Sequence, residues 1–356
     1  MHQVAECAGV GKATVSLALR DDPRLRPETR RRIQKLAAKM GYRTNATVAN
    51  LMAQLRASRI PKYQATIGLL NVSSDPRKLT LRTFREWAKG CNERALQLGY
   101  GLDPFWLHEP GVSPARLAEI LDSRNIRGLI VAALLNHSGL PDKFDAIWQH
   151  FACVVVGVRP AWPPFNFCSN DQFGTASQAT HRLWDYGYRR MGLVLNPEVD
   201  TMVDHRFSAG FWAGQEDLEG CERIPTFPFH HTREAAFRAW YAQHKPDVIL
   251  CLHYEVKKWI EEMKIKVPDE VGLAHMDWQD EHPDWAGMHQ NNTLVGVGSV
   301  DMLVGQLHRN EVGLPQFPKA SFIQSTWIDG PTIARRTGRK STRATARSSG
   351  AQKAAV

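Results

Sequence analysis

From residue 66 onward, apolar runs of strand length alternate with amphipathic helical patterns, and this alternation constrains the fold more than any other feature of the chain. Strand–helix alternation is typical of parallel sheets whose two faces are covered by helices. The pattern restarts after the proline-rich stretch 160–164, which predicts two α/β lobes with a ligand-binding cleft between them. The predicted strands are 66–72, 101–107, 128–134, 153–158, 191–195, 248–252 and 271–276. The predicted helices are 81–98, 114–123, 171–186 and 206–218.

A length of 356 residues allows two or three domains. The expected lobes are about 63–159 with 290–321, and about 160–289 with 322–334. The chain would then cross back near Gln290 and again near Phe322. Residues 335–356 should form a disordered basic tail, because they contain no large aliphatic side chain before Val356. No apolar run reaches the roughly 18 residues of a membrane span, so we expect no membrane partner.

The first 44 residues predict a small helix-turn-helix domain of three short helices. Two helical patterns within residues 2–19 flank Gly9, whose freedom to take a positive φ suits a tight turn. A third pattern covers 27–40 and ends before Gly41, the residue type that most often caps a helix at its C-terminus. Residues 45–62 hold a fourth, weaker helical pattern and a linker.

The second of these helices has the features of a DNA-recognition helix. It should start near Gly11, so that Lys12 and Ala13 project from its exposed N-terminal end, where a recognition helix reads base edges. Thr14 and Ser16 suit phosphate contacts, because hydroxyl groups and the amides at a helix start both donate to phosphate oxygens.

The charge distribution supports contact between this head and a polyanion. Residues 1–62 carry 13 Lys and Arg against 4 Asp and Glu, and residues 335–356 carry 7 against none. The intervening 63–334 carry 25 against 32, so the body is acidic although the whole chain has a net charge of +9. A basic head on an acidic body is typical of proteins whose head meets nucleic acid.

One string in the head is highly specific: Ala8-Gly9-Val10-Gly11-Lys12-Ala13-Thr14-Val15-Ser16. It is followed at fixed distances by Thr29-Arg30 and Gly41-Tyr42. With these motifs the chain resembles the lactose/galactose repressor (LacI/GalR) family. The resemblance continues to about Thr332 through the phrases Ile126-Arg127-Gly128-Leu129-Ile130, Gly187-Tyr188-Arg189-Arg190, Arg206-Phe207-Ser208-Ala209-Gly210-Phe211, Val267-Pro268-Asp269-Glu270-Val271 and Met276-Asp277.

The resemblance implies a sequence-specific transcriptional regulator, with repression as the favoured sign of regulation. Its affinity for a palindromic double-stranded operator would be controlled by a small-molecule effector, a sugar or sugar derivative, bound in a periplasmic-binding-protein-like core. Two recognition helices on one palindrome also predict a homodimer. Compared with the family pattern, the chain begins about four or five residues late, which points to another start site or a weakened head. Gly11 replaces a usual serine, and Met52 stands where a small residue is common.

The resemblance also implies functional residues. Asn45 and Leu51 match the hinge helix, whose leucine wedges into the minor groove. Arg206 and Asp277 match positions that bind the effector's hydroxyl groups, and Trp278 adjoins Asp277 where it could stack on a sugar. The candidate DNA-binding residues are Gly11, Lys12, Ala13, Thr14, Ser16, Arg20, Arg24, Asn45 and Leu51. The candidate effector-binding residues are Ser73, Ser74, Asp171, Arg206, Asp277, Trp278 and Gln290.

Several alternatives stay open at this point. Asp171 suits a helix cap better than a ligand contact, and Trp162, Trp212 and Trp285 are more compatible with packing than with sugar stacking. The competing function is a sugar-binding protein of the periplasmic type without a DNA role. The basic head and the lack of a recognisable signal peptide favour a cytoplasmic regulator.

Motifs for enzymatic or metal chemistry are incomplete. The segment 9–14 lacks the first glycine of a phosphate loop, and 206–210 lacks the first glycine of a nucleophile elbow. His230, His231 and Glu234 do not form a zinc-binding frame. The six cysteines are widely spaced, which indicates reduced thiols and not a metal site. We therefore expect no enzyme activity, no cofactor and no metal.

Overall fold

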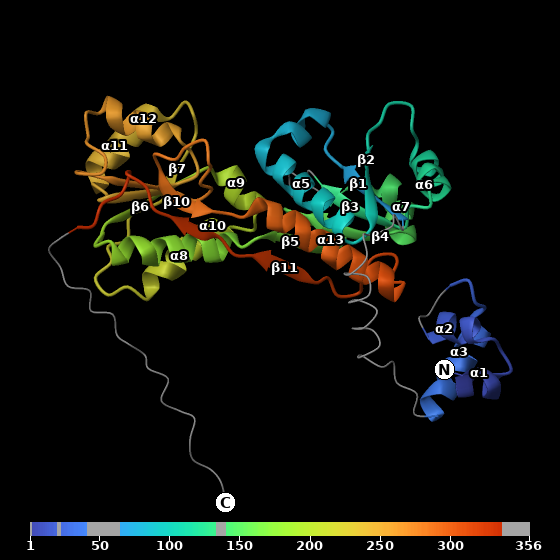
Figure 1. Ribbon diagram of the computed structural model, residues 1–356. Coiled ribbons are helices and arrows are strands. Elements are labelled where there is room, and N and C mark those ends of the chain that lie inside the picture. The colour runs from blue at the N-terminus through green and yellow to red at the C-terminus, as the bar shows by residue number, and fades with distance from the viewer. Residues whose placement is uncertain (1, 20–22, 41–64, 133–139, 337–356) are drawn as a thin grey trace, which may run out of the picture. The chain divides into compact units, whose positions relative to one another are not determined.

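The computed structural model describes residues 2–19, 23–40, 65–132 and 140–336 (Figure 1). The chain divides into two units. Unit 1 comprises Met1–Asp171 and Asn291–Gln324, and unit 2 comprises Gln172–Gln290 and Ser325–Val356. The predicted hinge helix, which includes Asn45 and Leu51, and the predicted tail beyond Arg336 lie outside the described residues.

The N-terminal head contains the three predicted helices, α1 (His2–Ala8), α2 (Lys12–Leu19) and α3 (Pro27–Lys39). Gly9 takes the expected positive φ of 65° between the first two. The side chains of Arg32 and Gln34 on α3 donate to the carbonyls of Ala8 and Ala18, at 3.1 and 2.9 Å. The core of this mini-domain is small and consists of Val4, Ala5, Ala8, Val15, Ala18, Ile33 and Ala37.

The rest of unit 1 is built on a six-stranded parallel sheet in the order β11-β5-β4-β3-β1-β2. Its strands are β1 (Ala65–Asn71), β2 (Tyr100–Trp106), β3 (Gly128–Ala132), β4 (Ala152–Val156), β5 (Asn166–Asn170) and β11 (Ala320–Ile323). Its helices are η1 (Pro76–Thr80), α5 (Arg82–Gln97), α6 (Pro114–Ser123), η2 (Asp142–Phe144), α7 (Asp145–His150) and α13 (Asn292–Arg309). Two separate hydrophobic clusters show that α5 and α13 cover one face and that α6 and α7 cover the other.

The contact between α5 and α13 is unusually close because glycines lie at the crossing. A Cβ atom on Gly90 would lie 1.9 Å from the carbonyl oxygen of Thr293, and one on Gly296 would lie 2.1 Å from that of Trp87. The two helix backbones therefore touch directly. The C-terminal segment of unit 1 is held against its N-terminal segment by this contact.

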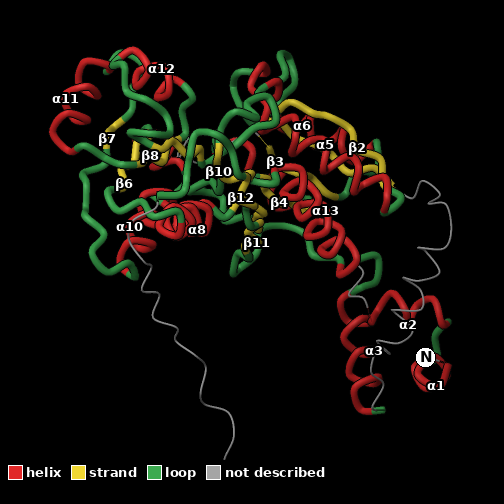
Figure 2. Tube along the Cα trace, turned by 60° about the vertical axis from the view of Figure 1, so that its left-hand side comes forward, coloured by secondary structure: helices red, strands yellow, loops and turns green. Residues whose placement is uncertain are grey.

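Unit 2 has a second six-stranded sheet, in the order β12-β10-β9-β8-β6-β7. Its strands are β6 (Met191–Leu195), β7 (Phe227–Pro228), β8 (Val248–Cys251), β9 (Gly272–His275), β10 (Ala286–His289) and β12 (Thr326–Ile328). All pair in parallel except β12, which pairs antiparallel with β10. Helices α8 (Gln172–Asp185) and α10 (Arg206–Glu216) pack together, as Figure 2 shows, and α9 (Pro197–Met202) precedes α10. Helices α11 (Glu234–His244) and α12 (Glu255–Glu262) form a hydrophobic cluster with side chains of β6, β8 and β9.

The predicted α/β architecture is confirmed, but the first lobe boundary was placed too early. The strand β5, which the sequence pattern did not reveal, pairs with β4 and β11 and so belongs to unit 1. The first crossing therefore follows Asp171 and not residue 159. The two later crossings follow Gln290 and Gln324. Within the described ranges, no helix combines the length and the apolar character needed to cross a membrane.

The glycine contact predicts a large effect from a single methyl group. Gly90→Ala should destabilise unit 1 by about 1–3 kcal/mol, because the new methyl group meets backbone and cannot be relieved by a side-chain rotation. Gly305→Ala in α13 is the matched control, since its methyl group would meet only the flexible end of Arg309 at 3.2 Å. The control should be stabilised by about 0.5–1 kcal/mol through helix propensity. Urea denaturation of both variants tests this, and equal stabilities would contradict the close contact.

Candidate DNA-binding head and effector-binding residues

The geometry of α2 follows from its two buried residues. Val15 and Ala18 are fully buried in the head core, and the amide of Val15 donates to the carbonyl of Gly11 at 3.2 Å. This bond makes Gly11 the residue that directly precedes the first helical residue, Lys12, close to the predicted start. Lys12, Ala13, Thr14 and Ser16 accordingly lie in the first five residues of α2. Gly11 itself is exposed and Thr14 is half-buried.

Of the other two predicted DNA contacts in the head, the structure describes only one. Arg24 is exposed in the turn between α2 and α3, whereas Arg20 lies outside the described residues. The structure adds a basic face that the sequence interpretation did not single out. Exposed Arg31, Lys35 and Lys39 follow one another at intervals of four along α3. Their helical spacing was the available signal, because residues four apart share one helix face.

The predicted effector residues of unit 1 lie at one edge of its sheet, because parallel strands end on the same side. Ser73 follows β1, and its hydroxyl accepts the amide of Asp75 at 3.2 Å. The indole of Trp106 donates to the carbonyl of Ser73 at 2.8 Å, which ties this turn to β2. Ser74 is exposed beside it. Asp171 follows β5, which β3 and β4 separate from β1, so the serines and Asp171 are not neighbours.

In unit 2, the ends of two adjacent strands bring three predicted residues together. Asp277 and Trp278 follow β9, and Gln290 follows β10. The amide of the Gln290 side chain donates to the carbonyl of Met276 at 2.9 Å, so Gln290 is a buried support of the loop. The indole of Trp278 donates to the carbonyl of Trp285 at 2.8 Å. Trp278 as a whole residue is half-buried.

Arg206 is half-buried and begins α10, directly after a turn that a buried aspartate holds. Asp200 accepts hydrogen bonds from the amide and hydroxyl of Ser208, at 3.2 and 2.6 Å, and from Nδ1 of His205 at 3.3 Å. These bonds stabilise a turn in which Asp204 and His205 have φ values of 55° and 57°. Non-glycine residues adopt such values only where the surroundings enforce them. Asp200 thus determines where Arg206 lies, a role that sequence inspection missed.

Sequence inspection also missed a group of imidazole and aromatic rings at the same edge of unit 2. His253 stacks on Phe229 with ring centroids 3.7 Å apart, and burial lowers the pKa of His253 to about 4. His275 stacks on Tyr254 at 3.9 Å, and burial lowers the pKa of His275 to about 3. Both imidazoles are therefore neutral near pH 7. Among the residues that the structure describes, no cluster of three histidine, cysteine or acidic side chains could hold a metal ion.

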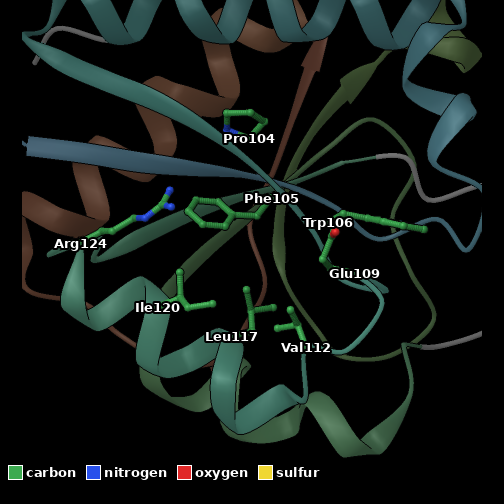
Figure 3. A pocket seen from close by; sticks show the side chains of 8 residues that line it. All are labelled: Pro104, Phe105, Trp106, Glu109, Val112, Leu117, Ile120 and Arg124. Carbon is green, nitrogen blue, oxygen red and sulfur yellow. The ribbon is translucent and has the colours of Figure 1, made fainter.

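A separate apolar pocket of about 190 Å³ lies in unit 1 between β2 and α6 (Figure 3). The guanidinium of Arg124 lies over the ring of Phe105, 5.5 Å from its centroid, at one end of this pocket. The remaining lining residues are Pro104, Trp106, Glu109, Val112, Leu117 and Ile120. None of the predicted effector residues lines it.

These features define a class of protein, in which a helix-turn-helix head precedes a core of two parallel-sheet units joined by three chain crossings. Residues 1–45 match the family described as bacterial regulatory proteins, lacI family. The match covers the head of the chain and agrees with the resemblance seen in its motifs.

Curated relatives of the chain are named as transcriptional regulators. The regulator CelR of Thermobifida fusca is 25% identical over 228 residues, which cover 62% of this chain and 59% of CelR. The regulator TreR of Escherichia coli is 26% identical over 58% of this chain and 59% of TreR. The regulator PtxS of Pseudomonas plecoglossicida is 24% identical over 88% of this chain and 90% of PtxS. The chain thus spans about three fifths of the first two relatives.

Solved structures agree on the fold. A CelR–cellobiose complex superposes with a TM-score of 0.57 at 18% identity and covers 92% of this chain and 98% of its own. A lac repressor dimer bound to operator and an anti-inducer superposes with a TM-score of 0.56 at 18% identity and covers 93% of this chain and 98% of its own.

The low pKa of His275 predicts a specific loss of stability in acid. Between pH 6.5 and about 3 the unfolded chain binds a proton at this residue that the folded chain excludes, so stability falls as pH falls. His275→Asn keeps a hydrogen-bond acceptor but does not titrate. For each pH unit between pH 6 and 4, the free energy of unfolding of this variant should fall by up to about 1.4 kcal/mol less than that of the wild type. Urea denaturation across this range measures the slope, and identical slopes for both proteins would contradict the assignment.

Proposed function

We propose that the chain is a sequence-specific DNA-binding transcriptional regulator, acting as a repressor, whose operator affinity is controlled by a small-molecule effector. One observation carries the proposal: a lacI-family head and an α/β core of two units occur in the same chain. The head supplies the recognition helix, and the core supplies the polar residues at the ends of parallel strands where α/β proteins bind ligands.

On operator DNA, α2 would lie in the major groove. Lys12 and Ala13 would read base edges, and Thr14, Ser16 and Arg24 would bind phosphates. The exposed row Arg31, Lys35 and Lys39 adds positive charge to the head. Leu51 remains the predicted minor-groove wedge.

For the effector, the chemistry of unit 2 favours a polyol. The carboxylate of Asp277 would accept hydrogen bonds from hydroxyl groups, and the guanidinium of Arg206 would donate two. Trp278 would stack on the sugar ring, and Gln290 would support the loop after β9 through its hydrogen bond to Met276. One of the structural neighbours is CelR in complex with cellobiose, which supports a sugar or sugar derivative as the effector of this chain. The bound effector must prefer one of two conformations of the protein, because equal affinity for both would regulate nothing.

The proposal includes a cytoplasmic homodimer on a palindromic operator, without enzymatic activity. A two-fold dimer presents two recognition helices to the two half-sites. A lac repressor dimer bound to operator is among the structures with this fold, which supports the same assembly here.

The alternative function is a sugar-binding protein that does not act on DNA. A gel shift over a range of salt concentrations distinguishes the two, because phosphate contacts release counterions and weaken steeply as salt rises. The exposed basic residues of the head favour the regulator, since a pure solute binder has no use for them.

We expect Lys12→Ala to weaken operator binding by about 1–3 kcal/mol and to relax base preference at one position in each half-site. Selection of bound sequences from a random duplex pool, with the wild type and the variant in parallel, gives both results. Lys245→Ala in unit 2 is the control for a change of net charge and should keep the wild-type preference. Unchanged preference in Lys12→Ala would show that Lys12 is not a base-reading residue.

Arg206→Ala and Asp277→Ala should each abolish the response to the effector while the operator affinity stays within about twofold of the wild type, because both lie in the core and not in the head. The measurement is release of a fluorescent operator duplex on addition of the sugar that a thermal-shift screen identifies. A normal response in both variants would place the effector site elsewhere in the chain.

A further inference from the structure

The ring of Tyr254 lies between two imidazoles in unit 2. Its centroid is 3.9 Å from that of His275 and 3.7 Å from that of His282, with interplanar angles of 6° and 29°. Trp285 packs edge-on against both Tyr254 and His275, at 86° and 88°. The three stacked rings come from the start of α12, the end of β9 and the loop between β9 and β10. We call these rings the Tyr254 stack.

The Tyr254 stack binds the backbone of Asp277 on both sides. Nδ1 of His275 accepts the amide N–H of Asp277 at 3.0 Å. The hydroxyl of Tyr254 donates to the carbonyl of Asp277 at 3.4 Å, a long hydrogen bond. With its amide and its carbonyl both engaged, the backbone of Asp277 has little freedom to rotate, so the direction in which its carboxylate leaves the chain is set.

The remainder of the β9–β10 loop is tied down by contacts of a different kind. The amide of Trp278 donates to the carbonyl of Met288 at 2.9 Å, which fixes the loop to β10. The ammonium of Lys257 lies 2.6 Å from the carboxylate of Asp284, but both side chains are partly exposed and such pairs contribute little. The Tyr254 stack therefore restrains Asp277 itself, while Gln290 and the Trp278 amide hold the residues on either side of it.

The protonation state of His275 matters for this arrangement. Its Nδ1 accepts a hydrogen bond, so this nitrogen carries no proton and the imidazole is in its neutral form. The ring is 1% exposed, and burial disfavours the charged form. The acceptor is thus available at any pH near neutrality, and the stack acts as a constant support.

We infer that Tyr254 and His275 are positioning residues for the carboxylate of Asp277, and that His282 completes the stack that holds them. The inference rests on the proposed role of Asp277 in binding an effector hydroxyl. A carboxylate that already points in the binding direction loses less conformational freedom when the ligand arrives, so affinity rises without a new contact.

The test compares Tyr254→Leu, which removes the stack, with Tyr254→Phe, which keeps the ring and removes the hydroxyl. Tyr241→Leu is the matched control, because Tyr241 is a partly buried tyrosine of the same hydrophobic cluster whose ring contacts Phe237 on α11. Asp277→Asn gives the reference for loss of the carboxylate. Each full-length variant is examined by amide hydrogen exchange at residues 277–284 and by calorimetric titration with a panel of neutral mono- and disaccharides that includes cellobiose.

Tyr254→Leu should raise the exchange rate at Asp277 and Trp278 and weaken sugar binding by up to about tenfold, the size expected when one binding side chain must be ordered on binding. Tyr254→Phe should stay within about threefold of the wild type, and Tyr241→Leu should alter stability without altering exchange in the loop. His282→Ala removes only the half-buried outer ring and should give a smaller change of the same sign. It serves as the test variant if Tyr254→Leu does not fold.

Unchanged exchange in the loop, or faster exchange with unchanged sugar affinity, would overturn the positioning role. Failure of the wild-type chain to bind any sugar of the panel would instead contradict the proposed class of effector. In that case, faster exchange at Asp277 in Tyr254→Leu would still support the action of the stack on the Asp277 backbone.

Discussion

Parallel strand pairing is the constraint on which the rest of the structure depends. A parallel strand can pair with the next one only after a crossover, and in both units helices provide most of these crossovers, whereas loops connect β4 to β5 and β9 to β10. All parallel strands of a sheet therefore end on one edge, so the residues that directly follow them gather there. Ser73, Asp171, Asp277 and Gln290 each lie within two residues of a strand end, and they owe their positions to this rule.

The sequence predicted those parts of the fold in which a strand is a continuous apolar run. It did not predict β5, whose Asn166, Ser169 and Asn170 are buried polar residues. They are tolerated because partners satisfy them: Asn166 accepts the amide of Lys319 at 2.7 Å, and Asn170 donates to Asn292 at 3.0 Å. Both partners come from more than a hundred residues downstream, and a local pattern contains no information about them. Helix α13 was missed for a related reason, since its glycines suit close contact with α5 and weaken the helical pattern.

The candidate sites were predictable to different degrees. The head could be inferred because its chemistry lies in one short string, and the same string also sets the local fold. Asp277 and Trp278 could be placed at a strand end by position and by resemblance. The supports of these residues could not be inferred, because Asp200 and the Tyr254 stack act through contacts between separate elements. A histidine or a tyrosine in the sequence does not reveal which ring it will stack against.

The three chain crossings have a consequence for the order in which the protein is made. The head is complete once α3 has been synthesised, whereas unit 1 gains its last strand only with β11 and unit 2 only with β12. At the usual rates of bacterial translation, roughly 15 to 60 seconds separate the synthesis of α3 from the synthesis of β12. During that interval a ribosome-bound chain carries a finished helix-turn-helix head and no finished core. A message cut short in the core would therefore yield heads that lack the completed sheets of unit 1 and unit 2.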